Sequence, residues 1–247
     1  MLRKLYFALL FSPSLFAQAH TANQFDQPNV VVKMLVIAGL SLLPFMVMLL
    51  TSFVKIVIVL SLLRNAIGVQ HTPPNQVING IALLLTIYVM FPTGMAMYDA
   101  SKEVIQKQSP TSLFSEETPT YLIDVALKAK EPLRDFLERN TAAKHMHSFY
   151  LLAQKSFPEP FKQDVKQNDF IVLIPSFIIS QLKGAFEIGV LIYLPFFVID
   201  LVVSNILLAM GMMMLAPLTI ALPIKLLLIV MLDGWTVLVQ GLVMTFR

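Results

Sequence analysis

The stretch Ala209-Met210-Gly211-Met212-Met213-Met214-Leu215-Ala216-Pro217 separates two long apolar runs. Four of the chain's 14 methionines lie within it, between positions 210 and 214. Methionine is unbranched and polarizable, so a cluster of it suits an irregular or changing surface better than leucine does. Gly211 permits backbone angles that other residues avoid, and Pro217 cannot continue a preceding helix. The stretch predicts a soft apolar loop or a broken helix inside a membrane-embedded assembly, with ordinary core filling as the alternative.

The composition of the 247 residues indicates a membrane protein. Hydrophobic residues make up 57% of the chain and charged residues only 13%, whereas a soluble domain carries about 25% charged residues. The net charge of +3 is small and no basic run is long, so we expect the membrane but no nucleic acid as a partner. The chain has no cysteine, which excludes disulfides and thiolate chemistry.

Residues 1–19 are typical of a secretory signal peptide. Arg3 and Lys4 form a positively charged start, and the apolar run 5–11 is too short to cross a bilayer, which needs about 20 apolar residues. Ala17-Gln18-Ala19 then offers small residues at the cleavage positions. An uncleaved amphipathic segment is the alternative.

Residues 30–98 predict a helical hairpin. The runs 34–54 and 77–97 contain no charged residue and are each long enough for a membrane-crossing helix. Pro73-Pro74 between them cannot continue the first helix, so the link is a turn. We expect Lys55 and Arg64 near that turn, which the positive-inside tendency places on the cytoplasmic side.

Residues 99–169 predict a polar helical region on the periplasmic side. They hold ten basic and eleven acidic residues, in contrast to the runs on either side. His145 and His147 are two positions apart and point to different helix faces, so we expect no metal site there. One apolar face is expected within 121–140, interrupted by Pro132: Leu122, Val125, Leu133, Phe136 and Leu137.

Residues 170–247 predict C-terminal apolar helices around the methionine stretch. Charges in such segments are costly, and they usually face a protein interior or an aqueous path. Lys183 and Glu187 are four residues apart and can pair along one helix. Asp200, Lys225 and Asp233 have no evident partner in the sequence, so they either pair with neighbouring subunits or mark helix ends near the lipid headgroups.

Catalytic motifs are missing from the sequence. It contains no His-Glu-x-x-His, no glycine-rich phosphate loop and no Gly-x-Ser-x-Gly. We therefore expect no enzymatic activity, no metal and no cofactor, which leaves a passage, a seal or a scaffold.

Three motifs, in this order, resemble those of one family. The first is Arg64-Asn65-Ala66-Ile67-Gly68 with Thr72-Pro73-Pro74-Asn75-Gln76, and the second is Tyr193-Leu194-Pro195-Phe196-Phe197-Val198-Ile199-Asp200-Leu201-Val202-Val203. The third is Leu222-Pro223-Ile224-Lys225-Leu226-Leu227 with Asp233-Gly234-Trp235. Together they resemble the type III secretion export-gate family, which comprises the R protein of virulence injectisomes and its homologue, the flagellar P protein.

Features of both branches of this family occur in the chain. The signal peptide and Thr72-Pro73-Pro74-Asn75-Gln76 look flagellar, whereas Tyr88-Val89-Met90-Phe91-Pro92 and Trp235-Thr236 look more like injectisome versions. We favour the injectisome. Flagellar members often have Ser-Glu-Leu-Lys where this chain has Ser180-Gln181-Leu182-Lys183. If that acid pairs with the lysine matching Lys225 in a neighbouring subunit, this chain must replace the contact, and Glu187 is a candidate.

The resemblance implies an all-α architecture in which kinked helical hairpins pack as a pore-forming homo-oligomer. Family members form a pentamer, completed by S-type and T-type partners (the flagellar Q and R equivalents), in the bacterial inner membrane. Their substrates are unfolded secreted proteins. By this resemblance Met212, Met213 and Met214, with Met210 beside them, project into the pore as a gasket.

Two other functions are compatible with the composition. A small-solute carrier with broken helices around a midplane site predicts internal repeats, and none is visible between the two apolar halves. A scaffold that recruits export subunits without lining the path fits the sequence as well as a pore subunit does.

Overall fold

A computed structural model of the chain describes residues 30–69, 72–107, 118–159, 161–212 and 214–246. Every regular element in these ranges is a helix, so the all-α prediction is confirmed. The predicted signal peptide lies outside the described residues. The helices are α2 (Val30–Leu50), α3 (Phe53–Ile67), α4 (Asn75–Lys107), α5 (Thr118–Arg139), α6 (Ala143–Ser156), α7 (Phe161–Asp164), α8 (Phe170–Ala209), α9 (Pro217–Met231) and α10 (Gly234–Met244).

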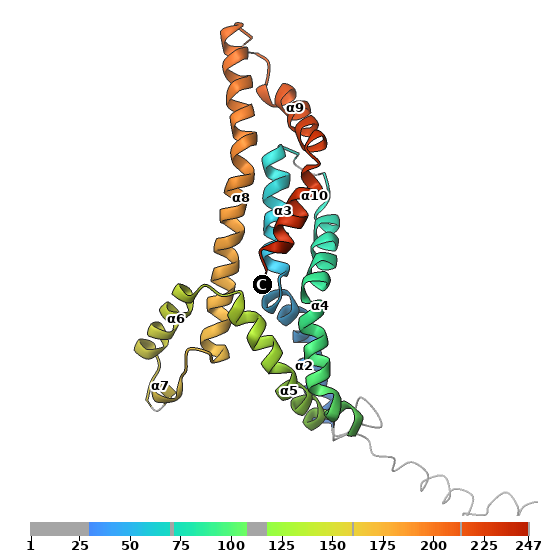
Figure 1. The fold of residues 1–247 in the computed structure, drawn as a ribbon, viewed down its shortest axis with the longest axis vertical. Helices are drawn as coiled ribbons and strands as arrows, with labels where there is room; N and C mark the ends of the chain where they lie inside the picture. The colour runs from blue at the N-terminus through green and yellow to red at the C-terminus, as the bar shows by residue number, and fades with distance from the viewer. Residues whose placement is uncertain (1–29, 70–71, 108–117, 160, 213, 247) are drawn as a thin grey trace, which may run out of the picture.

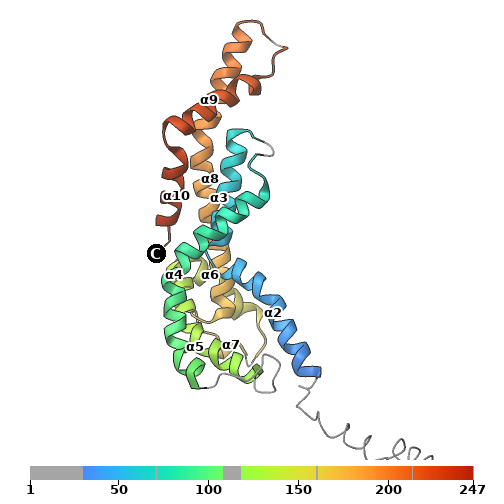
Figure 2. The ribbon, with the colours of Figure 1, turned by 90° about the vertical axis from the view of Figure 1, so that its right-hand side faces the viewer.

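Helix α8 runs along most of the length of the molecule (Figure 1). Helix α3 packs beside its middle, and α4 returns antiparallel to α3. The polar helices α5, α6 and α7 gather around the start of α8, whereas the methionine stretch joins α8 to α9 at the opposite end (Figures 1 and 2). Helix α10 then brings the chain back towards the middle of the molecule.

Two helices, α4 and α8, are each long and apolar enough to cross a membrane. Two further pairs, residues 37–50 of α2 with α3 and α9 with α10, are long and apolar enough when each pair is taken together, and they bend by 62° and 66° at short breaks. Helices satisfy their backbone hydrogen bonds internally, as a bilayer requires. The fold is that of an all-helical membrane protein.

The bend between α2 and α3 occurs at Thr51, not at Pro44, which lies inside α2. The Thr51 hydroxyl donates to the carbonyl oxygen of Val47 at 2.6 Å and accepts from the backbone N–H of Phe53 at 3.4 Å. A side chain that bonds the backbone in this way competes with the helical ladder. The first apolar run therefore forms two helices that meet at a bend.

Helices α3 and α4 form a hairpin whose turn is held by capping and by one arginine. Gly68 ends α3 with a φ of 92°, and its N–H donates to a carbonyl of the last turn. Arg64 donates to the side-chain oxygen of Asn75 at 2.6 Å and to the carbonyl of Pro73 at 3.3 Å. Lys55 lies in the first turn of α3, so its expected place near the hairpin turn is wrong.

The core lies where α3 is enclosed by α8 and α4. A side chain on Gly189 of α8 would place its Cβ 2.2 Å from Cδ1 of Leu62 on α3. The missing side chain therefore allows the two helices to approach closely. The buried members of this part of the core are Ile56, Val59, Leu60, Ile78, Ala82, Ala185 and Leu242.

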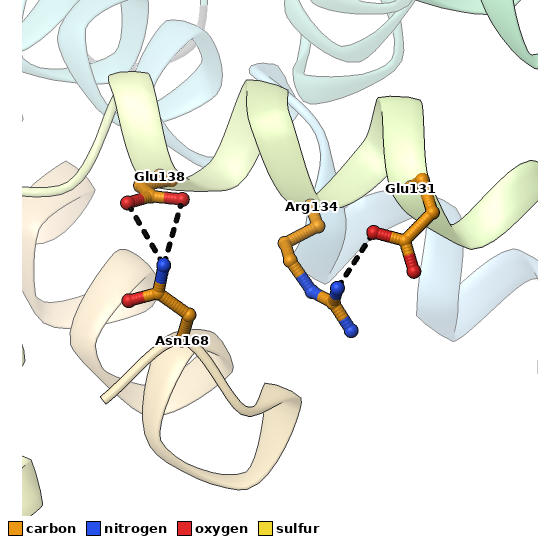
Figure 3. A network of polar contacts seen from close by, with 4 residues as sticks. All are labelled: Glu131, Arg134, Glu138 and Asn168. Carbon is orange, nitrogen blue, oxygen red and sulfur yellow. Dashed lines mark hydrogen bonds and ion pairs between the residues drawn. The ribbon is translucent and has the colours of Figure 1, made fainter. Parts of the chain in front are cut away.

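The polar region is docked against the start of α8. Phe136 and Leu137 of α5 are buried together with Leu173 and Phe177 of α8. At the α5–α8 junction, the side-chain amide of Asn168 donates to both carboxylate oxygens of Glu138 at 3.2 and 3.3 Å (Figure 3). Apolar and polar contacts together fix this region to the membrane helix.

An arginine of α5 adds a second contact at this junction. Arg134 pairs with Glu131 at 2.6 Å (Figure 3) and lies over the ring of Phe170, 5.0 Å from its centroid. The apolar face predicted for α5 is buried only towards its C-terminal end, since Leu122 is 41% exposed. The division at residues 98 and 169 stays a prediction. Helix α4 continues unbroken through the first of these boundaries.

We predict that Gly189→Val lowers the free energy of unfolding in mild detergent by about 1–3 kcal/mol, because the new side chain pushes Leu62 and α3 away from α8. Circular dichroism during heating measures this. Gly94→Ala in α4 is the matched control, since its Cβ would meet nothing within 4 Å. An unchanged melting curve for Gly189→Val would contradict close packing at this crossing.

Candidate functional site: the methionine loop and its anchor

Helix α8 ends in a Schellman motif at the start of the methionine stretch. Met210 is the C-cap, and Gly211 follows in the left-handed region with a φ of 73°. The N–H of Gly211 donates to the carbonyl of Leu208 at 3.1 Å, and that of Met212 donates to the carbonyl of Leu207 at 3.0 Å. These bonds satisfy two carbonyls that the helix end leaves open. The chain reversal thus depends on the glycine.

The loop ends where α9 begins at Pro217. Ala216 before it is extended, with φ of −67° and ψ of 121°. The backbone N–H and the hydroxyl of Thr219 both donate to the carbonyl of Ala216, at 3.1 and 2.8 Å. Proline at the first helical position loses no hydrogen bond, because that N–H has no helical partner. Both ends of the loop are therefore fixed by the backbone.

The methionine side chains of the loop are exposed in the single chain. Met214 is 103% exposed, Met210 is 66% and Met212 is 44%. Met213 lies outside the described residues. Clustered exposed apolar side chains mark surfaces that bind something else. The loop is thus an apolar tip at one end of the molecule, held out by α8 and α9 (Figure 2).

A buried lysine anchors the two helices that carry this loop. Lys225 of α9 is 2% exposed. Its ammonium donates to Oδ2 of Asp200 on α8 at 2.7 Å and to the carbonyl of Ala66 on α3 at 3.1 Å. A cation is favoured at a helix C-terminus, where Ala66 lies, because the helix dipole is negative there. One side chain therefore joins three helices.

The structure gives Lys225 a partner within its own chain. The alternative that it marks a helix end is wrong, since it lies in the middle of α9 and is buried. The side chain of its partner Asp200 is 35% exposed, so one side of this carboxylate remains accessible. Gly68, at the end of α3, lets α9 approach, because a Cβ on it would lie 3.2 Å from Cδ1 of Leu218.

The other three charges predicted as site residues are exposed in the single chain. Lys183 and Glu187 pair along α8 at 3.4 Å, with side chains 59% and 63% exposed. Ion pairs as exposed as this one contribute little to the stability of the fold. Asp233 lies at the bend between α9 and α10 with a φ of 49°, and its carboxylate accepts from the Thr236 hydroxyl at 2.9 Å. A role for them in subunit contacts stays a prediction.

A second buried lysine was not predicted as a site residue. Lys55 is 8% exposed, and its ammonium lies 4.6 Å from the centre of the Phe246 ring. Its stem passes Gly184 of α8, where a Cβ would lie 3.5 Å from Cε of the lysine. A lone lysine inside an apolar run is the sequence signal for such a residue, but by itself it indicates only topology.

The side chain of Gln181 on α8 is only 3% exposed. Its side-chain amide donates to the carbonyl of Asn140, in the link between α5 and α6, at 2.7 Å. A glutamate carboxylate cannot donate to that carbonyl. The amide at this position therefore matches the local backbone.

Chemically, this site offers mainly apolar contact. The loop itself carries no titratable side chain. Within the described ranges, no group of three histidine, aspartate or glutamate side chains is placed to hold a metal ion. The anchor charges neutralise each other. Such an arrangement suits the exclusion of water and contact with flexible apolar surfaces.

Comparison with known proteins identifies relatives over nearly the whole chain. The profile of the FliP family matches residues 36–242. The chain is 44% identical to the Hypersensitivity response secretion protein HrcR of Ralstonia nicotianae, over 85% of this chain and 94% of that protein. It is 44% identical to the Yop proteins translocation protein R of Yersinia pestis, over 90% and 97%. The Virulence protein YscR of Salmonella typhimurium is 42% identical, over 84% and 92%.

We predict that Asp200→Asn destabilises the protein more than Lys225→Met does. The first change leaves a buried ammonium without a counter-charge, at a cost of about 3 kcal/mol. The second leaves a partly exposed carboxylate that water can reach, at a cost of about 1 kcal/mol. Thermal unfolding in mild detergent measures both.

Lys183→Met, in the exposed pair of the same helix, is the control and should change stability by less than about 1 kcal/mol. Equal losses for Asp200→Asn and Lys225→Met would argue against a buried anchor.

We also predict that Gln181→Glu lowers stability by about 2–3 kcal/mol, because a charged carboxylate then faces the Asn140 carbonyl in a buried place. The exposed Gln163→Glu is the matched control, with the same change of charge and no expected effect. If the two variants unfold at the same temperature, the Gln181 amide does not stabilise the link between α5 and α6.

Proposed function

The chain belongs to the FliP family of type III secretion proteins, and we propose that it is a core pore subunit of the export gate. In this role it passes unfolded secreted proteins across the bacterial inner membrane. The names of its relatives refer to virulence and to the hypersensitivity response, which favours the injectisome over the flagellum. The observation that carries the proposal is the exposed methionine tip.

The exposure of apolar surface supports assembly with other subunits. Only ten of the 40 residues of α8 are buried in the single chain, and α2 leaves nearly all its described side chains exposed. Lipid can cover part of this surface, but not the loop, because non-helical backbone is tolerated at membrane depth only within protein or at water-filled cavities. We propose a homo-oligomer, a pentamer as in the family, with S-type and T-type proteins beside it.

The loop acts as the seal in this proposal. Copies of α8 and α9 bring their tips together around an axis, and the side chains of Met210, Met212 and Met214, with Met213, fill the opening. Hydrophobic constrictions exclude water and ions without any bond to break. Methionine side chains change rotamer readily, so they can yield to an unfolded chain and close after it. The polar region faces the periplasm.

The anchor gives this seal a fixed base. The span from Asp200 to Ala209 is about 14 Å along α8 at 1.5 Å per residue. The loop therefore lies a short distance beyond the junction on α8. The helix that follows the loop, α9, is bonded to α3 through Lys225. We infer that gating moves the methionine side chains and the loop, and leaves the three-helix junction in place.

The seal predicts a leak when its side chains are shortened. Changing Met212, Met213 and Met214 together to Ala should raise ion conductance through the assembled complex several-fold, because the apolar plug is lost. Planar-bilayer recording on the purified complex measures this. Met231→Ala is the matched control, a methionine 75% exposed at the far end of α9. Equal conductance in the triple variant and the parent would count against sealing.

Cross-linking separates a pore subunit from a scaffold. A photo-reactive amino acid at position 212 should capture a stalled secretion substrate, and the same group at position 231 should not. A scaffold that never lines the path gives no adduct at either position, although the complex still assembles.

A further inference from the structure

The methionine loop, at one end of the molecule (Figure 2), presents thioether side chains to its surroundings. Met214 is 103% exposed, Met210 66% and Met212 44%. A thioether has no acidic proton, so it takes no part in acid–base chemistry, but its sulfur lone pair reacts with peroxides in neutral water. Oxidation of sulfur is therefore the covalent change to which this tip is open.

The backbone of the loop keeps these side chains on the outside. The N–H of Leu215 donates to the carbonyl of Met212 at 3.3 Å, which closes a turn directly after the Schellman motif. Other methionines of the chain are packed, since Met90 and Met146 lie against the buried cluster where α5 meets α8. An oxidant in water consequently reaches the loop before it reaches these two.

The reaction balances with hydrogen peroxide as the only oxidant. The methionine sulfur gives an electron pair to one peroxide oxygen, the O–O bond breaks, and that oxygen becomes the sulfoxide oxygen. The other oxygen leaves as water with both protons of the peroxide, so sulfur loses two electrons and the peroxide gains them. Methionine sulfoxide reductases reverse the change.

Oxidation at the tip leaves the fold intact. The bonds that hold both ends of the loop join backbone groups to one another or to the Thr219 hydroxyl, and none of them uses a methionine sulfur. A sulfoxide on Met146, by contrast, would place a polar group against a buried apolar cluster. The loop can therefore change from apolar to polar while its two helices stay in place.

We propose that Met210, Met212 and Met214 form a reversible oxidation site that controls whether the seal is closed. The control of the seal rests on the sealing role proposed above, whereas the oxidation site rests on exposure alone. A sulfoxide oxygen accepts hydrogen bonds from water, so an oxidised loop lines the constriction with polar groups and lets it fill with water. Peroxide thus opens the seal, and a reductase closes it again.

The rate of oxidation tests the site itself. The purified complex in phospholipid vesicles is treated with hydrogen peroxide for increasing times, unfolded and cleaved with trypsin. One tryptic peptide, 184–225, has all its methionines in the loop, and another, 145–155, has Met146 alone. Per methionine, the mass of an added oxygen should appear several times faster in the first peptide than in the second. Equal rates, or a faster rate for Met146, overturn the proposal.

Planar-bilayer recording on the same complex tests the effect on the seal. Peroxide should raise the conductance several-fold, and methionine sulfoxide reductases acting on both epimers should restore the starting value. Met231→Leu removes a thioether that is 75% exposed outside the loop, and this variant should respond as the parent does. A fourfold leucine variant keeps the apolar volume without any loop sulfur and should stay sealed: Met210→Leu, Met212→Leu, Met213→Leu and Met214→Leu combined.

Three results would contradict control of the seal by oxidation. A peroxide response that the leucine variant shares would place the relevant oxidation elsewhere and overturn the proposal. An oxidised loop that stays sealed, while the alanine variant of the loop leaks, would overturn it as well. If neither peroxide nor the alanine variant raises the conductance, the sealing role fails and control of the seal falls with it, and the peptide masses alone decide the oxidation site.

Discussion

The ammonium of Lys225 is the point at which three helices meet. A lysine as buried as this one is stable only with a counter-charge, and Asp200 and the end of α3 supply it. Because the lysine is on α9 and the aspartate is on α8, the pair closes the base of the methionine loop from both sides. The position of the loop is then fixed although its methionines are exposed, because neither α8 nor α9 can move without the other.

Most of the remaining surface follows from a second constraint, which is that this chain cannot cover its own apolar faces. Helices α2, α4 and α8 leave large side chains exposed along their lengths. Lipid, further copies of the chain and other subunits can each cover exposed apolar faces, and different faces suit different partners. The methionine tip, for example, fits a ring of its own copies. The polar region binds the base of α8 through side chains of α5 and the segment before α8 (Figure 3).

Sequence patterns predict the features that depend on residues close together in the chain. Gly211 and Pro217 indicated the loop between α8 and α9, and the four-residue spacing of Lys183 and Glu187 indicated their pair. The pairing of Lys225 with Asp200 could not be predicted, because the two residues are separated by the loop and meet only after α9 folds back. The sequence pattern indicates the prolines as helix breakers, and it does not show that the helix ends at Thr51, whose hydroxyl bonds the backbone. The roles of the methionines stay predictions.

The most direct test of the account is whether the loops of different copies meet. The chain has no cysteine, so Met214→Cys introduces a single thiol per copy at the tip. In the intact complex, mild oxidation should join copies into disulfide-linked dimers, and prior dissociation of the complex in harsh detergent should prevent this. An intact complex that gives no dimer under the same oxidation would mean that the tips lie apart, and the methionine loop would not be the seal.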